Sequence, residues 1–362
     1  MSIPFAKPLI NKQDIKHLNI AAKSQWISKG KYVTNFEKKL SNYLNTKYVG
    51  VTSSGSSAIM LAFLILGLKP GDEIILPGYG FLAAANVAKT LGLKVVFSDV
   101  DLESYCVDLE KIKKVITKKT KLIIVIHLYG NMCDIGKIAS FCKSKKIFLL
   151  EDSAQSIGSR FRNKQSGTFG DMGVYSFTAT KTLTTGEGGA IIFKSKKFYK
   201  KFLLYRSYGY IKERYYCLVH GHNLRMSNLL AAIGYSQISR ISQIERKRKQ
   251  IYLQYQNQLK QKNYTLQKFN KNVSAVPWAL AIKLHSNFTQ KKRNLVIKKL
   301  KKVGIEVRNG YYSPNELPIF KKKYNLPNSF KLSRGIISLP YYEELNKKQI
   351  KYICNNLDQI LS

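Results

Sequence analysis

Short apolar runs alternate with helix-like segments between about residue 48 and residue 193 of this 362-residue chain. The apolar runs lie at 73–76, 94–97, 122–126, 147–150, 173–175 and 189–193, and the segments with a helical pattern lie at 56–66, 82–91, 108–116 and 135–145. Near-continuous apolar strands joined by helices are typical of a parallel sheet that is covered on both faces. The pattern therefore predicts an α/β fold with a large, mostly parallel sheet flanked by helices.

The pattern changes after residue 193, where helical segments dominate at 196–207 and 228–260 before a smaller alternation of strands and helices. No Gly/Ser-rich linker separates the two parts, which favours close packing between them. We predict a large domain of residues 1–245 and a smaller C-terminal α/β domain of residues 246–362, with the junction inside one long helix.

The charge balance raises a second class of function. Lys and Arg number 61 against 21 Asp and Glu, which gives a formal net charge of +40, a feature of many nucleic-acid-binding proteins. The lysines are scattered along the whole chain, however, and the sequence has no helix-turn-helix, zinc-finger or RNA-binding sheet motif. We therefore expect a solvated basic surface that attracts an anionic substrate, with neither nucleic acid nor a membrane as partner.

Two further features bear on the cellular compartment. The longest near-continuous apolar run, 59–68, is too short to span a bilayer, and the first residues lack the pattern of a signal peptide. The five cysteines are widely spaced and form no CxxC pair, so neither a disulfide framework nor a metal site is predicted. These observations predict a cytoplasmic protein with reduced thiols.

The ordered set of Asp152, Gln155, Ser176 and Lys181 carries the strongest chemical signal in the chain. A lysine amine can form a Schiff base with the aldehyde of pyridoxal 5′-phosphate (PLP), and a buried aspartate can keep the pyridine nitrogen protonated. Asp152 and Ser176 each end a predicted strand, on the side of the sheet where ligands gather. We predict that Lys181 is the nucleophile and that partial burial lowers its pKa. The alternatives are a helix cap for Asp152 and a solvated loop for Lys181.

Residues 52–58 join a predicted strand to a helix and suit the binding of an anion. Gly55 allows the backbone to approach a phosphate closely, and the hydroxyl of Ser54 or Ser56 can add a hydrogen bond to those of the first helical N–H groups. By itself the segment favours a simple N-cap. Beside the Lys181 and Asp152 pattern, we interpret it as a phosphate cradle.

Four other residues have both a binding and a structural interpretation. Phe81 precedes a predicted helix on the ligand side, where its ring suits stacking on a pyridine or an ordinary core position. His127 ends the strand 122–126 and suits either a ligand contact or a structural hydrogen bond. Asn223 and Arg225 can bind phosphate oxygens, but they also suit a polar surface.

Together these stretches resemble the DegT/DnrJ/EryC1/StrS family of sugar aminotransferases, which has the fold-type I PLP architecture. The resemblance runs from about residue 27 to residue 242 and is weaker beyond. It is carried by residues 52–56, 70–73, 95–101, 127–130, 151–155, 176–177, 180–181, 186–189 and 223–226. Residues 181–189 look especially like the branch of the family that aminates GDP-linked 4-keto-6-deoxyhexoses.

The resemblance implies a role for each matching position of the cofactor site. Lys181 would carry the cofactor, while Asp152 would pair with its ring nitrogen and Gln155 with its ring hydroxyl. Phe81 would stack on the ring. The phosphate-binding positions would be Gly55, Ser56 and Ser176.

The resemblance also implies a homodimer with active sites at the interface, because Asn223 would reach the phosphate of the neighbouring subunit. The candidates for substrate contacts are His127, Glu187, Arg225 and Arg308. Two departures from the family pattern lie on this side of the site. Leu224 follows the asparagine where the family often has Tyr or Phe, and residues 307–312 keep the arginine of an Arg-Pro pair without the proline or the family's histidine-containing loop.

The implied reaction moves an amino group from glutamate to a nucleotide-linked keto sugar, as in the synthesis of deoxyamino sugars for polysaccharides such as O-antigen. We favour a GDP-linked 4-keto-6-deoxyhexose, and a UDP- or dTDP-linked 3- or 4-keto sugar is the alternative. The PLP-dependent dehydratases of the family replace the lysine with histidine, so Lys181 weighs against that activity. The alternative from another class, a nucleic-acid-binding protein without catalysis, predicts steeply salt-dependent binding and no chromophore.

Overall fold

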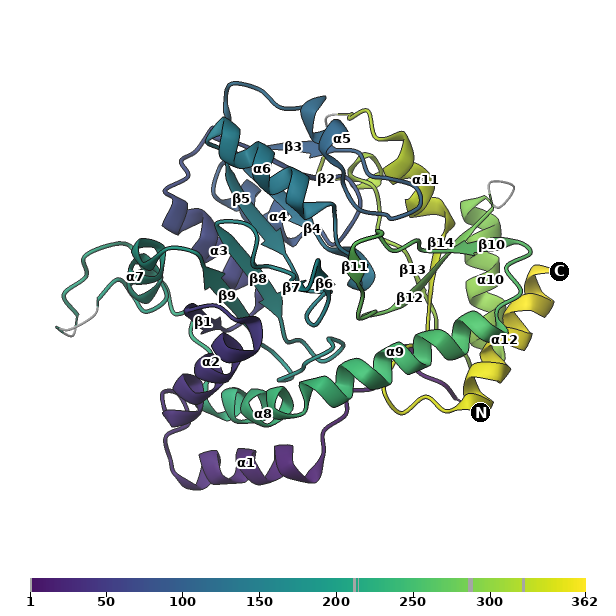
Figure 1. Ribbon diagram of the computed structural model, residues 1–362, viewed down its shortest axis with the longest axis horizontal. Helices are drawn as coiled ribbons and strands as arrows, with labels where there is room; N and C mark the ends of the chain where they lie inside the picture. Colours follow the sequence, from purple (N-terminus) through teal and green to yellow (C-terminus); the bar gives the residue numbers. More distant parts are fainter. Residues whose placement is uncertain (1, 211–212, 214, 286–288, 321–322) are drawn as a thin grey trace.

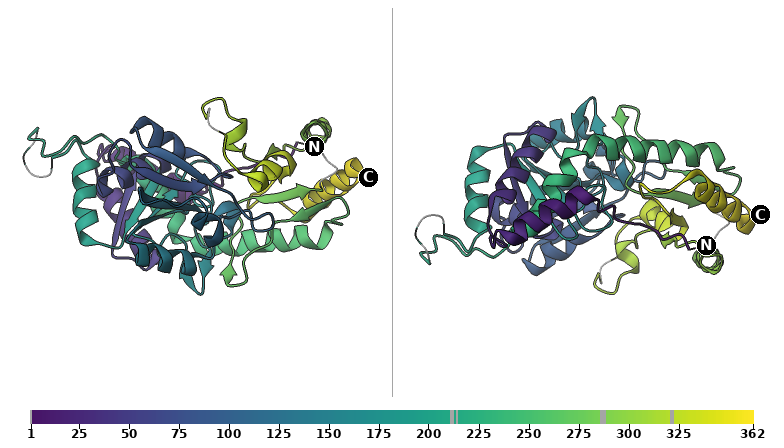
Figure 2. Two further views of the ribbon diagram at one scale, coloured as in Figure 1. Left: turned by 90° about the horizontal axis from the view of Figure 1, so that it is seen from above. Right: turned by 90° about the horizontal axis from the view of Figure 1, so that it is seen from below.

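The computed structural model describes residues 2–210, 213, 215–285, 289–320 and 323–362 (Figure 1). Two parts of unequal size lie side by side in it. The larger part is built around a broad central sheet, and the smaller part contains the C-terminal strands and helices. Figure 2 shows that both ends of the chain lie at the smaller part.

The central sheet, within the described residues, has seven strands in the order β1-β9-β8-β5-β4-β2-β3. The strands are β1 (Tyr48–Thr52), β2 (Glu73–Pro77), β3 (Lys94–Ser98), β4 (Thr120–Ile126), β5 (Phe148–Asp152), β8 (Met172–Ser176) and β9 (Gly189–Phe193). Only β9 runs against its neighbours, β1 and β8, and the other pairs are parallel. The carboxyl ends of β1, β5 and β8 therefore meet at one edge, and the predicted mostly parallel sheet is confirmed.

Helices cover both faces of this sheet, as near-continuous apolar strands require. Alternate residues of β4 show it: Leu122 and Ile124 pack in one hydrophobic core, and Ile123 and Val125 in another. The helices of this part are α1 (Lys12–Lys23), α2 (Lys31–Leu44), α3 (Gly55–Leu66), α4 (Ala83–Thr90), α5 (Leu109–Lys113), η1 (Leu128–Gly130), α6 (Ile135–Lys145), α7 (Lys196–Tyr205) and α8 (Asn228–Ser239).

The smaller part has an antiparallel sheet of its own, ordered β10-β12-β14-β13 in the described chain. Its elements are α9 (Ile241–Gln258), β10 (Tyr264–Leu266), β12 (Leu280–Leu284), α10 (Gln290–Lys302), β13 (Arg308–Asn309), η2 (Pro314–Glu316), α11 (Pro327–Gly335), β14 (Ile336–Leu339) and α12 (Lys347–Leu361). A minor sheet joins β11 (Val273–Ser274) to β6 (Arg160–Phe161) and β7 (Lys164–Gln165). It links the two parts through backbone hydrogen bonds.

Helix α9 runs from the larger part to the smaller one (Figure 1). Its first residue, Ile241, packs in a core of the larger part, whereas Ile251 and Tyr255 pack in the core of the smaller part. That second core also holds Ile3, which pairs with Ile305. The first residues of the chain therefore pack with the C-terminal part, and a boundary at residue 245 stays a prediction.

The helical segments expected over 228–260 are two helices, α8 and α9, which meet at Arg240. The φ angle of Arg240 is −114°, outside the helical range. Its guanidinium donates hydrogen bonds to the carboxylate of Asp14 and to the carbonyl of Leu9. The segment expected over 108–116 is helical only to Lys113. No helix among the described residues combines the length and apolar character needed to cross a membrane.

Candidate active site

A cavity of about 460 Å³ lies at the carboxyl edge of the central sheet and reaches the C-terminal part. Its volume falls in the range of small-molecule sites. Its walls include these residues proposed from the sequence: Gly55, Ser56, Phe81, Asp152, Ser176, Lys181, Glu187 and Arg308. The shared strand direction brings Gly55, Asp152 and Ser176 together, because β1, β5 and β8 all end there. Arg308 comes from β13 of the other sheet.

Lys181 lies on the turn that joins β8 to β9. Backbone hydrogen bonds from Phe177 to Gly188 and from Thr185 to Phe177 close this turn, and Gly188 has a φ of 154°, which favours glycine. Burial lowers the pKa of the Lys181 amine to about 8, and the nearby Asp152 carboxylate acts in the opposite direction. Near that pH much of the amine is neutral, as a nucleophile must be.

Asp152 ends β5 and is buried, with 5% of its surface exposed. Its Oδ1 accepts a hydrogen bond of 3.0 Å from the N–H of Ala154. No helix follows, so the helix-cap alternative is wrong. Burial raises the pKa of Asp152, while the Ala154 N–H and the charge of Lys181 lower it. A carboxylate in this position gains from a cationic partner in the cavity.

The segment after β1 forms a polar cradle at the start of α3. Ser54 is the N-cap, and its Oγ accepts the N–H of Ser57 at 3.0 Å. Gly55 and Ser56 line the cavity next to Ser176. A Cβ atom at Gly55 would lie 3.1 Å from the Cβ of Ser176, so this approach of two backbones is close. The N-cap and the anion site proposed from the sequence are thus compatible, because the first N–H groups of α3 meet the cavity.

An aromatic wall, which the sequence did not single out, lines one side of the cavity. It consists of Tyr129, Trp278 and Tyr311, beside Phe81. Tyr129 stacks on Trp278 with ring centroids 6.1 Å apart, and on Tyr311 at 5.8 Å. The ring centroids of Phe81 and Tyr311 are 6.4 Å apart. Phe81 is 61% exposed, which excludes the alternative of a core position for this residue. Tyr129 and Tyr311 stood in stretches noted above, but only the fold shows that they meet.

Gln155 lies behind this wall. Its Oε1 accepts the backbone N–H of Tyr129 at 3.1 Å, and its Nε2 donates to the hydroxyl of Tyr311 at 3.1 Å. The side chain therefore ties a residue of the larger part to one of the C-terminal part. The second hydrogen of Nε2 is left for a further acceptor.

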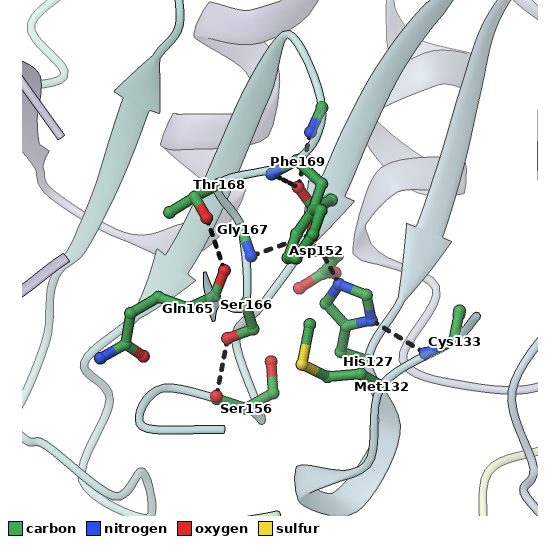
Figure 3. Close-up of polar contacts among 12 residues, drawn as sticks. His127, Met132, Cys133, Asp152, Ser156, Gln165, Ser166, Gly167, Thr168 and Phe169 are labelled. Carbon is green, nitrogen blue, oxygen red and sulfur yellow. Dashed lines mark hydrogen bonds and ion pairs between the residues drawn. The ribbon is translucent and has the colours of Figure 1, made fainter. Parts of the chain in front are cut away.

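His127 has the structural role that the sequence left open. It is fully buried, and its Nδ1 accepts the N–H of Cys133 at 3.3 Å (Figure 3). Nε2 therefore carries the proton and donates to Glu151 at 2.8 Å. Both ring nitrogens are used and His127 does not line the cavity, so the structure does not bring it to the other candidates for substrate contact.

Glu151, next to Asp152 on β5, organises the loop that leads to β8. Its Oε1 accepts the N–H groups of Phe169 and Gly170 at 2.6 and 2.7 Å. Its Oε2 accepts the N–H of Gly167 and the proton of His127. Four donors thus meet one fully buried carboxylate on the strand that presents Asp152.

We expect Glu151→Gln to lower the free energy of unfolding by about 3 kcal/mol, because an amide group would direct N–H donors at groups that also donate. Urea denaturation of the apoprotein measures this effect. Glu110→Gln is the matched control, since the Glu110 side chain is 75% exposed and pairs with Lys113. Its change should stay within about 0.5 kcal/mol. Equal stability of Glu151→Gln and the parent would contradict the network.

Of the remaining candidates, two line the cavity and two do not. Glu187 and Arg308 line it, and Arg308 is half exposed, with its guanidinium 4.3 Å from the ring of Phe5. Asn223 is exposed, and its Oδ1 accepts Nε of Arg225 at 2.9 Å. Neither of these two side chains lines the cavity. A phosphate contact from Asn223 therefore needs a second copy of the chain.

The donor set of the cavity fits PLP. An amine of lowered pKa suits the aldehyde, a buried carboxylate suits a protonated pyridine nitrogen, and a glycine at a helix N-terminus with two serines suits a phosphate. These groups are Lys181, Asp152, and Gly55 with Ser56 and Ser176. Phe81 adds an exposed ring at the same cavity.

Comparison with known proteins gives matches along nearly the whole chain. Residues 8–358 match the profile of the DegT/DnrJ/EryC1/StrS aminotransferase family. GDP-perosamine synthase of Escherichia coli O157:H7 is 34% identical over 99% of this chain and 99% of its own, and that of Vibrio cholerae is 33% identical over 98% and 97%. The PLP form of the putative sugar aminotransferase Spr1654 from Streptococcus pneumoniae superposes with a TM-score of 0.95, at 24% identity and with 100% and 99% coverage.

Proposed function

This chain belongs to the DegT/DnrJ/EryC1/StrS aminotransferase family, and from that premise we propose that it transfers the amino group of glutamate to a GDP-linked 4-keto-6-deoxyhexose. It is a PLP-dependent sugar aminotransferase. One observation supports the assignment of roles above all: Lys181 and Asp152 face the same cavity, which also holds a phosphate cradle. The GDP-linked sugar is proposed from the full-length similarity to GDP-perosamine synthases.

Bound PLP supplies an electrophilic aldehyde and a ring that withdraws electrons from the carbon at which the amino group is exchanged. The amine of Lys181 would be the attachment point and the carrier of the proton at that carbon, since its lowered pKa lets it take up and release protons near pH 8. Asp152 would keep the ring nitrogen protonated. This ion pair would offset the cost of burying the carboxylate, a cost that raises the pKa of Asp152.

The stoichiometry of the proposed reaction is balanced by the two substrates. Glutamate leaves as 2-oxoglutarate, and the keto sugar takes up the nitrogen and becomes the amino sugar. Arg308, half exposed at the cavity, is the candidate for holding an anionic group of either substrate. Glu187 lines the same wall and is the candidate for contacts with sugar hydroxyls.

We further infer a homodimer with shared active sites. Asn223 and Arg225 lie outside the cavity of their own chain but close to the phosphate cradle in the fold. Arg225 forms an isolated β-bridge with Thr52, which directly precedes the cradle. Their exposed polar groups suit the phosphate of a neighbouring subunit. A cytoplasmic location also belongs to the proposal, and the free state of the cysteines among the described residues agrees with a reducing compartment.

A product assay tests the function. The purified protein is incubated with PLP, glutamate and, in turn, GDP-, UDP- and dTDP-linked keto sugars, and 2-oxoglutarate and the amino sugar are measured by mass spectrometry. We expect both products with the GDP-linked 4-keto-6-deoxyhexose, at a kcat/KM at least about tenfold above the UDP and dTDP substrates. Absence of 2-oxoglutarate with every sugar would refute the proposal, and preference for another nucleotide would refute its GDP part.

A further inference from the structure

Trp278 reaches the reactive lysine from the C-terminal half of the chain. Its indole Nε1 donates a hydrogen bond of 2.7 Å to the carbonyl of Thr180, the residue before Lys181. The Nζ atom of Lys181 lies 4.3 Å from the centroid of the indole ring. One side chain therefore contacts both the backbone and the amine of the segment that carries the cofactor.

The indole is itself held on several sides, so it can act as a fixed support. The backbone N–H of Trp278 donates to the carbonyl of Tyr129 at 3.2 Å, and its carbonyl accepts Nη1 of Arg248 at 3.0 Å. The ring lies within 8° of parallel to the ring of Tyr129. Only 9% of the residue is exposed, so the indole has little freedom to turn away from Lys181.

We propose that Trp278 is a positioning residue for the amine of Lys181: its N–H anchors the carbonyl of Thr180, and its ring face holds the amine over the cavity. This inference rests on the proposed function in one respect, that Lys181 is the group to which PLP attaches. It adds a residue from the C-terminal part to the control of an amine that belongs to the larger part.

Each contact has a distinct physical consequence. The Nε1–H bond restrains the turn between β8 and β9 at the residue before Lys181, so its loss lets the amine sample positions away from the cavity. The ring face attracts an ammonium more than a neutral amine. Loss of the ring removes this attraction, which by itself moves the pH at which the amine loses its proton downward.

Other charged and titratable groups surround Lys181 and stay unchanged in the variants below. They line the two cavities on either side of its segment. On one side they are Asp152, Glu187, Arg308, Tyr129, Tyr175 and Tyr311, and on the other Lys7, Arg240, Arg248, Tyr341, Tyr342 and Glu343. Because this background is common to all variants, a shift between them reports the change at position 278.

The experiment measures how fast PLP attaches to the apoprotein between pH 6 and pH 10, by borohydride trapping and mass spectrometry of the peptide that contains Lys181. The variants are Trp278→Phe, which keeps a ring but loses the N–H, and Trp278→Leu, which loses both. Trp26→Phe is the matched control, because Trp26 is the other tryptophan of the chain, is 70% exposed and does not line the cavity.

We expect Trp278→Phe to attach PLP about three- to tenfold more slowly at the high-pH plateau, with nearly the parent's pH midpoint. Trp278→Leu should show the slower plateau and a midpoint lower by about half to one pH unit. Trp26→Phe should match the parent. A role in folding alone would lower the melting temperature without moving the midpoint.

Parent-like plateau rates and midpoints in both Trp278 variants would overturn the inference. If Trp278→Leu fails to fold, the plateau rate of Trp278→Phe tests the inference, and a parent-like rate overturns it. The outcome for the proposed function is separate: attachment of PLP to a residue other than Lys181 in the parent protein would refute that function, whereas correct attachment with indistinguishable variants would refute only the role of Trp278.

Discussion

Replacing Lys181 with alanine lowers transamination by at least about 10³-fold and removes the visible absorbance of the PLP-loaded protein. The variant lacks the amine that attaches the cofactor and moves the proton, and the reaction depends on both of these roles. Release of 2-oxoglutarate from glutamate in a single turnover measures the chemical loss, and an absorbance spectrum after removal of free PLP measures the loss of attachment.

Lys197→Ala is the control for this variant. Lys197 is exposed on α7 and lies outside the cavity, so its removal changes the net charge equally and should leave turnover and absorbance as in the parent. The control matters because the chain carries a formal charge of +40, and a nonspecific effect of charge on an anionic substrate would appear in both variants. Borohydride trapping of PLP on another residue of Lys181→Ala, at the level of the parent, would disprove the assignment of the attachment site.

The sequence brought several candidate residues of the site together because their positions depend on strand direction. Asp152 and Ser176 follow apolar runs, and parallel strands must end at the same edge of their sheet. Gly55 and Lys181 come within a few residues of strand ends as well. Short-range patterns were therefore enough to place four parts of the site together without any knowledge of tertiary packing.

The aromatic wall could not be predicted in this way. Trp278 and Tyr311 belong to the C-terminal part, and the contact between Trp278 and Thr180 joins residues 98 positions apart. No periodic pattern in the sequence specifies which residue of one domain meets a given turn of another. The same limit applies to His127, whose place at a strand end suggested the ligand side although its ring is used by Glu151 and Cys133.

The prediction of secondary structure from the sequence was incomplete mainly where long-range contacts interrupt a local pattern. The helical pattern over 228–260 is continuous in the sequence, yet the helix is interrupted at Arg240. The side chain of Arg240 donates a hydrogen bond to Asp14 in the N-terminal segment. Asp14 is fully buried and also accepts Nε2 of Gln237. Gln237 and Arg240, at the end of α8, thus both bind the carboxylate of Asp14, which lies more than 220 positions away in the sequence.

The second large effect is expected for Asp152→Asn, which should lower transamination by about 10²- to 10³-fold. An amide cannot keep the pyridine nitrogen protonated, so the buried ion pair with the cofactor is lost. The apoprotein should unfold at no lower temperature than the parent. Burial raises the pKa of Asp152, so the charged carboxylate is a cost to the folded apoprotein above its folded pKa, and the substitution removes that cost.

Asp152→Asn should also change the titration of Lys181, in a direction that a simple loss of activity does not predict. The Asp152 carboxylate raises the pKa of the lysine, which burial lowers to about 8; without that charge the pKa falls further, and PLP attaches to the apoprotein at lower pH. The pH midpoint of attachment, measured by borohydride trapping, should therefore shift downward while turnover decreases. Asp134→Asn is the control, because Asp134 lies on the surface before α6 and pairs with Lys137. An unchanged midpoint in Asp152→Asn would mean that the two side chains do not act on each other, and the electrostatic coupling at the centre of the site would have to be abandoned.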